Sequence, residues 1–304
     1  MQLVSRLPAL HDEAWAWEVI CALAERARAG AAVSVRTGVA WAAPGQLTEV
    51  AIERAELVLD PEEEPCFQSA LRLAPSVRQL LELYLPLCVG ARANALVLGH
   101  VGQSLDGQIA TAGGASRYVT GPENIVHMHR LRSLFDAVLV GAGTVEADDP
   151  ELTTRLVPGP NPTRVVLDPR LRLSEQRKLF HDELAPTIVV CEKGRAHSAK
   201  IAAASLLEVD ARAGLLSIPA LLAALARRGL SRVFVEGGGI TISSFIRAEC
   251  LDRLHVTICP IIIGQGRPGL CLPGVDRLEQ ALRPKARRFT LGEDVLFDCA
   301  LSPR

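Results

Sequence analysis

Two glycine-rich turns in the sequence have the pattern of a ligand-binding loop between a strand and a helix. Gly141-Ala142-Gly143-Thr144 follows the apolar run Ala137–Val140, and Gly237-Gly238-Gly239 follows Val233–Val235. Glycine lets the backbone approach a ligand closely, and the N–H groups that open the following helix bind phosphate. Because a dinucleotide carries a pyrophosphate, two such turns in one sheet favour a nucleotide cofactor.

Neither turn matches a standard nucleotide-binding motif. The fingerprint G-x-G-x-x-G requires glycine at the position of Glu146, and a P-loop requires a Gly-Lys-Ser/Thr run that is absent from the sequence. Each turn alone is explained equally well as a tight connection between a strand and a helix. The nucleotide-binding hypothesis therefore depends on other residues.

Polar groups gather in three further segments. Ser104-Leu105-Asp106-Gly107 is a turn signal after an apolar run. Thr120 and Glu123 have the spacing of a capping box for a helix in which Met128, Leu131 and Phe135 face inward. Residues 146–155 form an acidic cluster that ends in Arg155, directly after the first glycine turn. Such a density of charge is unusual in a chain that is 49% hydrophobic.

The composition sets limits on the class of protein. The 304 residues carry 33 Lys and Arg against 34 Asp and Glu, for a net charge of −1. This balance argues against a polybasic protein that binds nucleic acid or anionic membranes. No apolar run reaches the about 18–20 residues of a membrane span, and Met1–Glu13 lacks a signal-peptide core. The eight scattered cysteines form no C-x-x-C pair, so we expect a cytoplasmic protein with reduced thiols.

The pattern changes near residue 90, which divides the chain into residues 1–92 and 93–304. The first part reads as a small α+β extension of unknown role. Its periodicity predicts a helix over Glu13–Arg28, strands over Ala31–Ala40 and Thr48–Leu59, and helical structure over Cys66–Leu85.

The second part alternates short apolar runs with helical stretches over Pro122–Phe135, Pro219–Arg228 and Ile242–Ala248. Runs of this kind are typical of strands buried on both faces, so we expect an α/β fold with a mainly parallel central sheet flanked by helices. The runs are Ala95–Leu98, Ala137–Val140, Val165–Leu167, Thr187–Cys191, Val233–Val235 and His255–Ile263.

The order and spacing of these motifs resemble the reductase domain of riboflavin biosynthesis, the C-terminal half of the bifunctional deaminase–reductase in the dihydrofolate-reductase-like superfamily. The resemblance covers residues 95–301. It is carried by Ser-Leu-Asp-Gly at 104–107, Val-Thr-Gly-Pro-Glu at 119–123, His-Arg-Leu-Arg at 129–132, Val-Gly-Ala-Gly-Thr-Val at 140–145, Ala-Asp-Asp-Pro-Glu-Leu-Thr at 147–153 and Val-Glu-Gly-Gly at 235–238.

The resemblance implies an NADPH-dependent reduction of a 5-amino-6-(phosphoribosylamino)pyrimidine to its ribityl form, by a homodimer without a metal. Asp148 and Glu236 would be catalytic, with Asp148 handling a proton. Arg132 and Arg155 suit a bidentate grip on the substrate phosphate. The substrate side would comprise Ser116, Arg132, Leu152, Arg155 and Glu236. The cofactor contacts would be Gly102, Tyr118, Thr144, Asp148, Gly238, Gly239, Ile240, Thr241, Ile242, Ser243 and Ser244.

The chain departs from the family pattern at four places. His100 stands where a lysine is common, and Gln108 stands where Lys or Arg follows Ser-Leu-Asp-Gly. Tyr118 replaces Trp, and the second turn reads Gly-Gly-Gly-Ile-Thr rather than Gly-Gly-Pro-Thr-Leu. The first two changes bear on the substrate. They leave open a reductase of another heterocycle, such as a pterin or a diaminopyrimidinone sugar phosphate, and a nucleotide-binding protein without turnover.

A zinc site is the weaker interpretation of the remaining histidines and cysteines. His11-Asp12-Glu13 and Pro65-Cys66 imitate parts of a deaminase signature, but Ser69 stands where the second cysteine is required. His127 and His129 are two apart on a predicted helix and cannot share a face, so we expect them on the helix surface.

Overall fold

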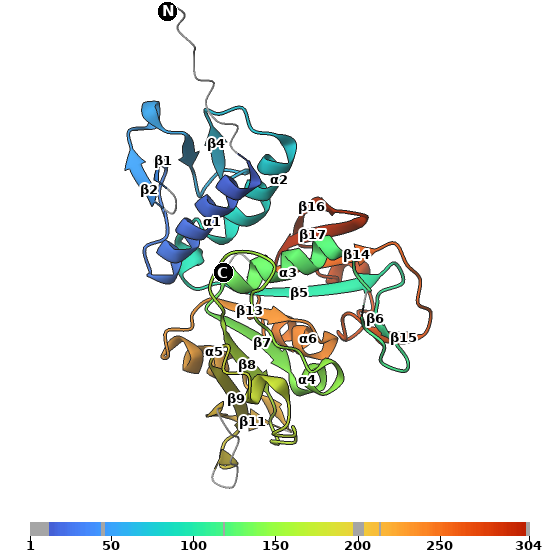
Figure 1. Cartoon of the computed structure of the whole chain (residues 1–304). Helices are drawn as coiled ribbons and strands as arrows, with labels where there is room; N and C mark the ends of the chain where they lie inside the picture. The colour runs from blue at the N-terminus through green and yellow to red at the C-terminus, as the bar shows by residue number, and fades with distance from the viewer. Residues whose placement is uncertain (1–11, 44–45, 118, 197–203, 213, 302–304) are drawn as a thin grey trace, which may run out of the picture. The chain divides into compact units, whose positions relative to one another are not determined.

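The computed structural model describes residues 12–43, 46–117, 119–196, 204–212 and 214–301 (Figure 1). The chain forms two compact units, residues 1–94 and 95–304. Among the described residues, no helix combines the length and apolar character that crossing a bilayer requires.

The described residues of the first unit form two α-helices and an antiparallel sheet of four strands in the order β2-β1-β3-β4. The helix predicted over Glu13–Arg28 is confirmed as α1, which begins at the N-cap Asp12 and packs Trp17 edge-on against Tyr84. The other elements are β1 (Thr37–Ala43), β2 (Gln46–Val50), β3 (Leu57–Leu59), β4 (Phe67–Ser69) and α2 (Pro75–Tyr84).

Three expectations for this unit are wrong. Ala31–Ala40 is not one strand, because residues 31–36 are largely exposed and β1 begins only at Thr37. Cys66–Leu85 is not helical throughout, because Phe67–Ser69 pairs with β3 and the helix starts only at Pro75, whose fixed φ suits a first turn. Thr48–Leu59 is not one strand, because the 3₁₀ turn Ile52–Arg54 separates β2 from β3.

The second unit is built on a nine-stranded sheet in the order β10-β9-β8-β7-β13-β5-β14-β17-β16. The strands from β10 to β14 run parallel, and the last two pair antiparallel at one edge. The predicted mainly parallel sheet is confirmed. Its strands are β5 (Val97–Ser104), β7 (Ala137–Gly141), β8 (Thr163–Leu167), β9 (Thr187–Glu192), β10 (Ala204–Val209), β13 (Val233–Glu236), β14 (Arg253–Cys259), β16 (Lys285–Leu291) and β17 (Asp294–Ala300).

Helices and two small strand pairs complete this unit. The helices are α3 (Pro122–Leu134), α4 (Ala142–Asp148), α5 (Ile218–Ala226) and α6 (Gly239–Arg247). The strand pairs are β6 (Gln108–Thr111) with β15 (Gly266–Pro268), and β11 (Ala211–Arg212) with β12 (Leu215–Leu216).

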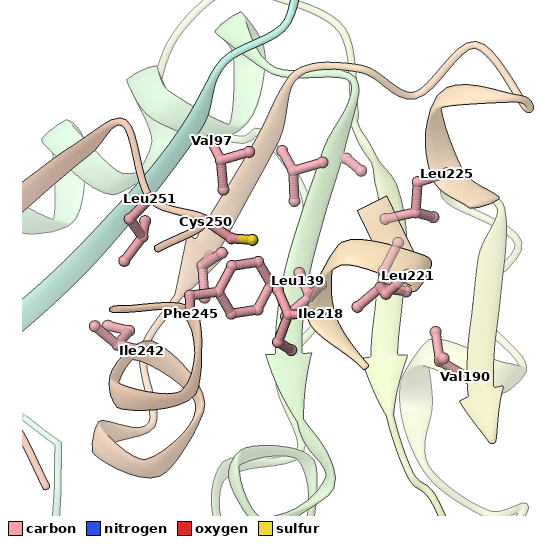
Figure 2. Close-up of a cluster of buried hydrophobic side chains, with 14 of the residues drawn as sticks. Val97, Leu139, Val190, Ile218, Leu221, Leu225, Ile242, Phe245, Cys250 and Leu251 are labelled. Atoms are coloured by element: carbon pink, nitrogen blue, oxygen red, sulfur yellow. The ribbon is translucent and has the colours of Figure 1, made fainter. Parts of the chain in front are cut away.

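One face of the large sheet is apolar. Side chains of α5 and α6 pack there against alternate residues of the strands, as Figure 2 shows for Ile218 and Phe245 beside Leu139. Because side chains alternate across a strand, the intervening residues of the same strands lie on the opposite face. There His100 of β5 contacts Asn124 of α3, and Phe234 of β13 contacts Phe135 at the end of that helix. The apolar face under α5 and α6 supplies much of the hydrophobic stabilisation of the unit.

The opposite face carries a buried polar network under α3. The ring of His100 on β5 is 3% exposed, and its Nε2 lies 3.0 Å from Asn124 Oδ1 and 3.1 Å from Thr257 Oγ1. The Thr257 hydroxyl also donates to Asn124 Oδ1, so the imidazole Nε2–H is the donor to that oxygen. Burial, followed by the nearby His255, lowers the pKa of His100 to about 3.

A chain of titratable groups continues this network. His127 on α3 and His255 on β14 are joined Nε2 to Nδ1 at 3.0 Å, and His255 Nε2 lies 3.3 Å from Asp298 Oδ1. The buried Asp298 also accepts from Arg253 and Arg287, at 2.5–2.9 Å. Burial alone would raise the pKa of Asp298, but the partners His255 and Arg253 hold it well below its ordinary value. Burial first, and then His255, lowers the pKa of His127.

This polar face overturns several expectations for α3. His127 and His129 do not lie exposed on the helix surface. Both are buried, on different sides of α3, because each has a polar hydrogen-bond partner there. Met128 is only half-buried. Thr120 does not cap the helix, whose N-cap is Gly121; the Thr120 hydroxyl instead accepts from Asn124 Nδ2.

We predict that the second unit loses stability as the pH falls below about 6.5, the ordinary pKa of histidine in an unfolded chain. In that range the unfolded chain binds protons that the buried His100, His127 and His129 do not, and each contributes a slope of about 1.4 kcal/mol per pH unit. Denaturation at pH 5–8 followed by circular dichroism measures this, because Trp15, Trp17 and Trp41 all lie in the first unit and fluorescence would report that unit alone.

His100→Gln should make the dependence of the free energy of unfolding on pH shallower, by the slope of one proton, about 1.4 kcal/mol per pH unit. Replacement of the exposed His181 by Gln is the matched control. An unchanged slope in His100→Gln would show that this histidine is not held neutral by the fold.

Candidate functional site

The two glycine turns lie beside each other at the carboxyl ends of adjacent parallel strands. β7 and β13 pair with Leu139 opposite Val235, so the turns that follow them meet at one edge of the sheet. A Cβ on Gly141 would lie 2.7 Å from Thr241 Oγ1, and one on Gly238 would lie 3.3 Å from Thr144 Oγ1. Each turn is therefore approached by the threonine of the other. The carboxyl edge of a parallel sheet is the usual place for ligands in such folds.

The second turn has a backbone that favours glycine and an open helix start. Gly237 and Gly238 both have φ of 75°, in the left-handed region, and Gly238 is the N-cap of α6. Among the described residues no side chain caps this helix, so its first N–H groups stay available to an anion. Gly239 has a packing reason as well, because a Cβ there would lie 2.5 Å from the carbonyl oxygen of Pro268.

A pocket of about 440 Å³ opens beside these turns. Gly141, Ile240, Thr241 and Ser244 contribute to its wall, and all but Gly141 are predicted cofactor residues. The wall is completed by Leu167, Pro169, Gly214–Pro219, Arg247 and Ala248.

Glu236 ends β13 on the face that carries α3, where it meets Arg132. Phe234 lies two residues earlier on the same face of the sheet. Its ring centroid is 5.9 Å from that of Phe135, the C-cap residue of α3. The Arg132 guanidinium donates from Nε and Nη2 to the two Glu236 oxygens, at 2.7 and 2.5 Å. The side chains are only 10% and 14% exposed, so the pair is largely removed from water.

Arg132 also reaches the 148–155 loop, which follows the first glycine turn. Its Nη1 donates to the carbonyl oxygen of Thr153 at 2.9 Å. The loop contains two non-glycine residues with positive φ, Asp149 at 42° and the buried Leu152 at 56°. Such backbone persists only where its surroundings hold it.

Three more side chains hold the same loop. The buried Arg164 donates to the carbonyl oxygen of Glu151 at 3.3 Å, and Asn161 Oδ1 accepts from the Thr154 N–H at 2.8 Å. His129 Nδ1 accepts from the Arg155 N–H at 2.9 Å. The Arg155 side chain is 48% exposed, and its Nη1 donates to Glu151 and Thr153, each at 2.7 Å. The loop therefore presents a half-exposed guanidinium from a fixed backbone.

Asp148, the last residue of α4, contacts a second predicted site residue. Ser116 donates from Oγ to Asp148 Oδ1 at 2.8 Å, which brings together one residue expected on the cofactor side and one expected on the substrate side. Gly102 on β5 packs against Thr120, whose Cγ2 would lie 2.6 Å from a Cβ at that position. Tyr118 lies outside the described residues. The structure thus brings Ser116 against Asp148 and Arg132 against Glu236. Two predicted cofactor residues have fully buried side chains: Ile242 lies in the apolar core, and the Ser243 hydroxyl accepts from the Cys271 N–H.

Comparison with known proteins gives this arrangement a family. Residues 95–296 match the RibD C-terminal domain, two thirds of the chain. The chain belongs to the RibD C-terminal domain family. The resemblance to the riboflavin-biosynthesis reductase domain is confirmed, and the family match begins at the first residue of the second unit.

Individual relatives show how much of each protein is shared. The RibD domain chain is 35% identical to the Riboflavin biosynthesis protein RibD of Aquifex aeolicus over 197 residues, 64% of this chain but only 54% of that protein. It is also 35% identical, over 217 residues, to the 2,5-diamino-6-ribosylamino-4(3H)-pyrimidinone 5′-phosphate reductase of Methanothermobacter thermautotrophicus, which covers 66% of this chain and 96% of the relative. The chain therefore spans about half of a RibD relative and nearly all of the archaeal one.

A solved structure supports the fold of this RibD domain. The deaminase/5-amino-6-(5-phosphoribosylamino)uracil reductase of Thermotoga maritima superimposes with a TM-score of 0.61 and 27% identity, over 75% of this chain and 62% of that chain. The α/β fold class predicted from the sequence is confirmed.

The two departures that bear on the substrate have a structural explanation. His100 is buried in the polar network under α3, as a hydrogen-bonded, uncharged ring. Gln108 closes the Ser-Leu-Asp-Gly turn: its N–H donates to Ser104 Oγ at 2.9 Å, and its Nε2 donates to the carbonyl oxygen of Asp106 at 3.1 Å. Asp106 accepts from Ser104 and from the N–H groups of Ile263 and Gly264, and these bonds lower its pKa, that from Ser104 most.

Several residues that build the site were not predicted for it from the sequence. His129 stood inside the His-Arg-Leu-Arg motif, which was an available signal. Asn161 lies just before β8 and Arg164 lies on that strand, and nothing in the sequence around either residue indicates a role in the site. Among the described residues, no group of three or more His, Cys, Asp or Glu side chains could hold a metal ion.

We predict that Gly239→Ala destabilises the second unit by about 1–3 kcal/mol, because the added methyl would clash with the backbone of Pro268 and Gly269. Gly143→Ala is the matched control: it lies in α4 with no atom within 4 Å of a Cβ, so the free energy of unfolding should be unchanged or up to about 1 kcal/mol higher. Thermal unfolding measures both. Equal stabilities for the two variants would contradict the packing assigned to Gly239.

Proposed function

We propose that the chain is a cytoplasmic, NADPH-dependent reductase that converts a 5-amino-6-(phosphoribosylamino)pyrimidine to its ribityl form. The observation that carries the proposal is the meeting, at one edge of the sheet, of the two glycine turns with the Arg132–Glu236 pair and the fixed 148–155 loop. The two glycine turns suit a dinucleotide, and the Arg132–Glu236 pair with the 148–155 loop suits a phosphorylated polar substrate. Relatives named as reductases of this kind support it.

The cofactor side fits NADPH. Gly238 and Gly239 open α6 with free backbone N–H groups for a pyrophosphate, and a side chain at Gly238 would close that approach. Ile240, Thr241 and Ser244 offer an apolar surface and hydroxyls in the adjoining pocket. Gly102, Thr144 and Asp148, with Tyr118, complete the proposed set of side-chain and backbone contacts. Because the side chains of Ile242 and Ser243 are fully buried, these two residues contribute to the site through the fold of α6 alone. Bound NADPH would supply a hydride to the first carbon of the opened ribose.

The substrate side divides the work between two arginines. We assign Arg155 to binding of the substrate phosphate, because its guanidinium is half-exposed at the end of a loop whose backbone is fixed by hydrogen bonds. Arg132 holds Glu236 and the loop itself, so that the Glu236 carboxylate faces the ribose or pyrimidine as a fixed acceptor. Leu152 shapes the loop between them through its left-handed backbone.

Asp148 handles the one proton that the reduction requires. Its Oδ1 accepts from the Ser116 hydroxyl, which can pass a proton between the carboxylate and the heteroatom attached to the reduced carbon. The remainder of the catalysis is positioning, because holding reactants in a fixed geometry removes much of the entropic barrier.

The activity test follows the oxidation of NADPH with two substrates, a diaminopyrimidinone and an aminouracil, each carrying ribose 5-phosphate through the 6-amino group. Turnover of either supports the proposal, and the ratio identifies the preferred base. Binding of NADPH without turnover would instead support a nucleotide-binding protein. Failure to bind NADPH would contradict the cofactor assignment. Light scattering on the same sample tests the proposed homodimer.

We predict that Arg155→Ala raises the KM for the phosphorylated substrate about 10–100-fold, the loss expected for charge-assisted hydrogen bonds to a phosphate. The affinity for NADPH should be unchanged. Arg288→Ala, at an exposed arginine on β16, is the matched control and should leave both values as they are. An unchanged KM in Arg155→Ala would remove Arg155 from the phosphate site.

A further inference from the structure

His129 is the buried side chain on α3 that contacts the backbone of the proposed phosphate-binding arginine. It lies one turn before Arg132, so the two residues share a side of the helix. His127, two residues earlier, points instead into the network with His255. His129 is 3% exposed, and its Nδ1 is 2.9 Å from the Arg155 amide nitrogen.

The hydrogen bond fixes the state of the ring. Nδ1 accepts the Arg155 N–H only when it carries no proton, so the ring is neutral with its hydrogen on Nε2. Burial, and then the positive charges of Arg132 and Arg155, lowers the pKa of His129 to about 4. At neutral pH the acceptor is therefore always present.

Three consecutive residues of the loop are held in this way. The Thr153 carbonyl binds Arg132, the Thr154 N–H binds Asn161, and the Arg155 N–H binds His129. The Arg155 side chain is 48% exposed, so little packing holds it. The position of its guanidinium therefore depends on the position of the Arg155 backbone, which His129 holds. The same side of α3 holds Glu236 through Arg132, so one helix sets the separation between Arg155 and Glu236.

We propose that His129 is a positioning residue for substrate binding: it holds the backbone of Arg155 so that the guanidinium meets the substrate phosphate at a fixed distance from Glu236. The inference rests on the proposed function, in which Arg155 binds that phosphate. His129 itself does not touch the reacting atoms. Its effect should therefore depend on the phosphate of the substrate, which a role in packing alone would not.

The experiment compares three replacements of His129 on two substrates, the ribosylaminopyrimidine with and without its 5′-phosphate. His129→Asn keeps an acceptor oxygen near the position of Nδ1, His129→Gln keeps one near Nε2, and His129→Leu keeps none. We expect His129→Leu and His129→Gln to raise the KM for the phosphorylated substrate about tenfold, with little change in kcat or in NADPH affinity, and His129→Asn to restore most of the loss. The unphosphorylated substrate should show no difference among the three.

Hydrogen exchange gives a second readout that needs no substrate. The Arg155 amide should exchange faster in His129→Leu and His129→Gln than in the unmodified chain, and close to the native rate in His129→Asn. If His129→Leu does not fold, the Asn and Gln variants still make the comparison, because they differ only in where the acceptor lies.

The outcomes separate this inference from the function on which it rests. Equal effects on both substrates, or no difference between Asn and Gln, would overturn the positioning role while leaving an Arg155→Ala effect, and so the proposed phosphate site, intact. If Arg155→Ala itself does not distinguish the two substrates, the phosphate assignment fails and the positioning role fails with it.

Discussion

The site depends on the buried ion pair between Arg132 and Glu236. A bidentate pair this far from water is not a large net source of stability, because removing both charges from solvent costs about as much as their attraction returns. Removing one partner is different: the charge that remains is left buried and unpaired, which costs about 3–5 kcal/mol. The pair therefore fixes the positions of α3, the end of β13 and the 148–155 loop relative to one another. The Arg132 guanidinium does so by binding Glu236 on one side and the Thr153 carbonyl on the other.

The two faces of the large sheet differ in the polarity of what they bury. The face covered by α5 and α6 is filled by aliphatic and aromatic side chains, whose burial stabilises the domain without directional demands (Figure 2). The face under α3 also buries apolar side chains, such as Phe234 against Phe135. In addition it carries a polar network in which His100, His127, His255 and Asp298 require defined partners. Such a network fixes the register of α3 over the sheet, and the register decides where His129 and Arg132 lie.

The sequence predicts the apolar half of this molecule well. Runs such as Ala137–Val140 and Val233–Val235 became central parallel strands, and the glycine turns after them became neighbours, because strand burial and glycine chemistry are local signals. Three strands at the ends of the sheet were missed: β10 at one end, and β17 and β16 at the other, where polar residues such as Arg287 and Asp298 break the apolar pattern. The roles of His129 and Arg132 were also beyond the pattern: their partners, Arg155 and Glu236, lie 26 and 104 residues away, and only the fold brings them together.

The proposed reaction reduces the first carbon of a ribose that is attached to an aminopyrimidine. The most direct measurement is to incubate the purified chain with the phosphoribosylaminopyrimidine and NADPH carrying deuterium at the transferable position, and to examine the product by mass spectrometry and NMR. The expected product is a ribityl compound with deuterium on the first carbon of the sugar chain. Deuterium on the pyrimidine ring, or unchanged substrate in the presence of bound NADPH, would contradict the proposed reaction.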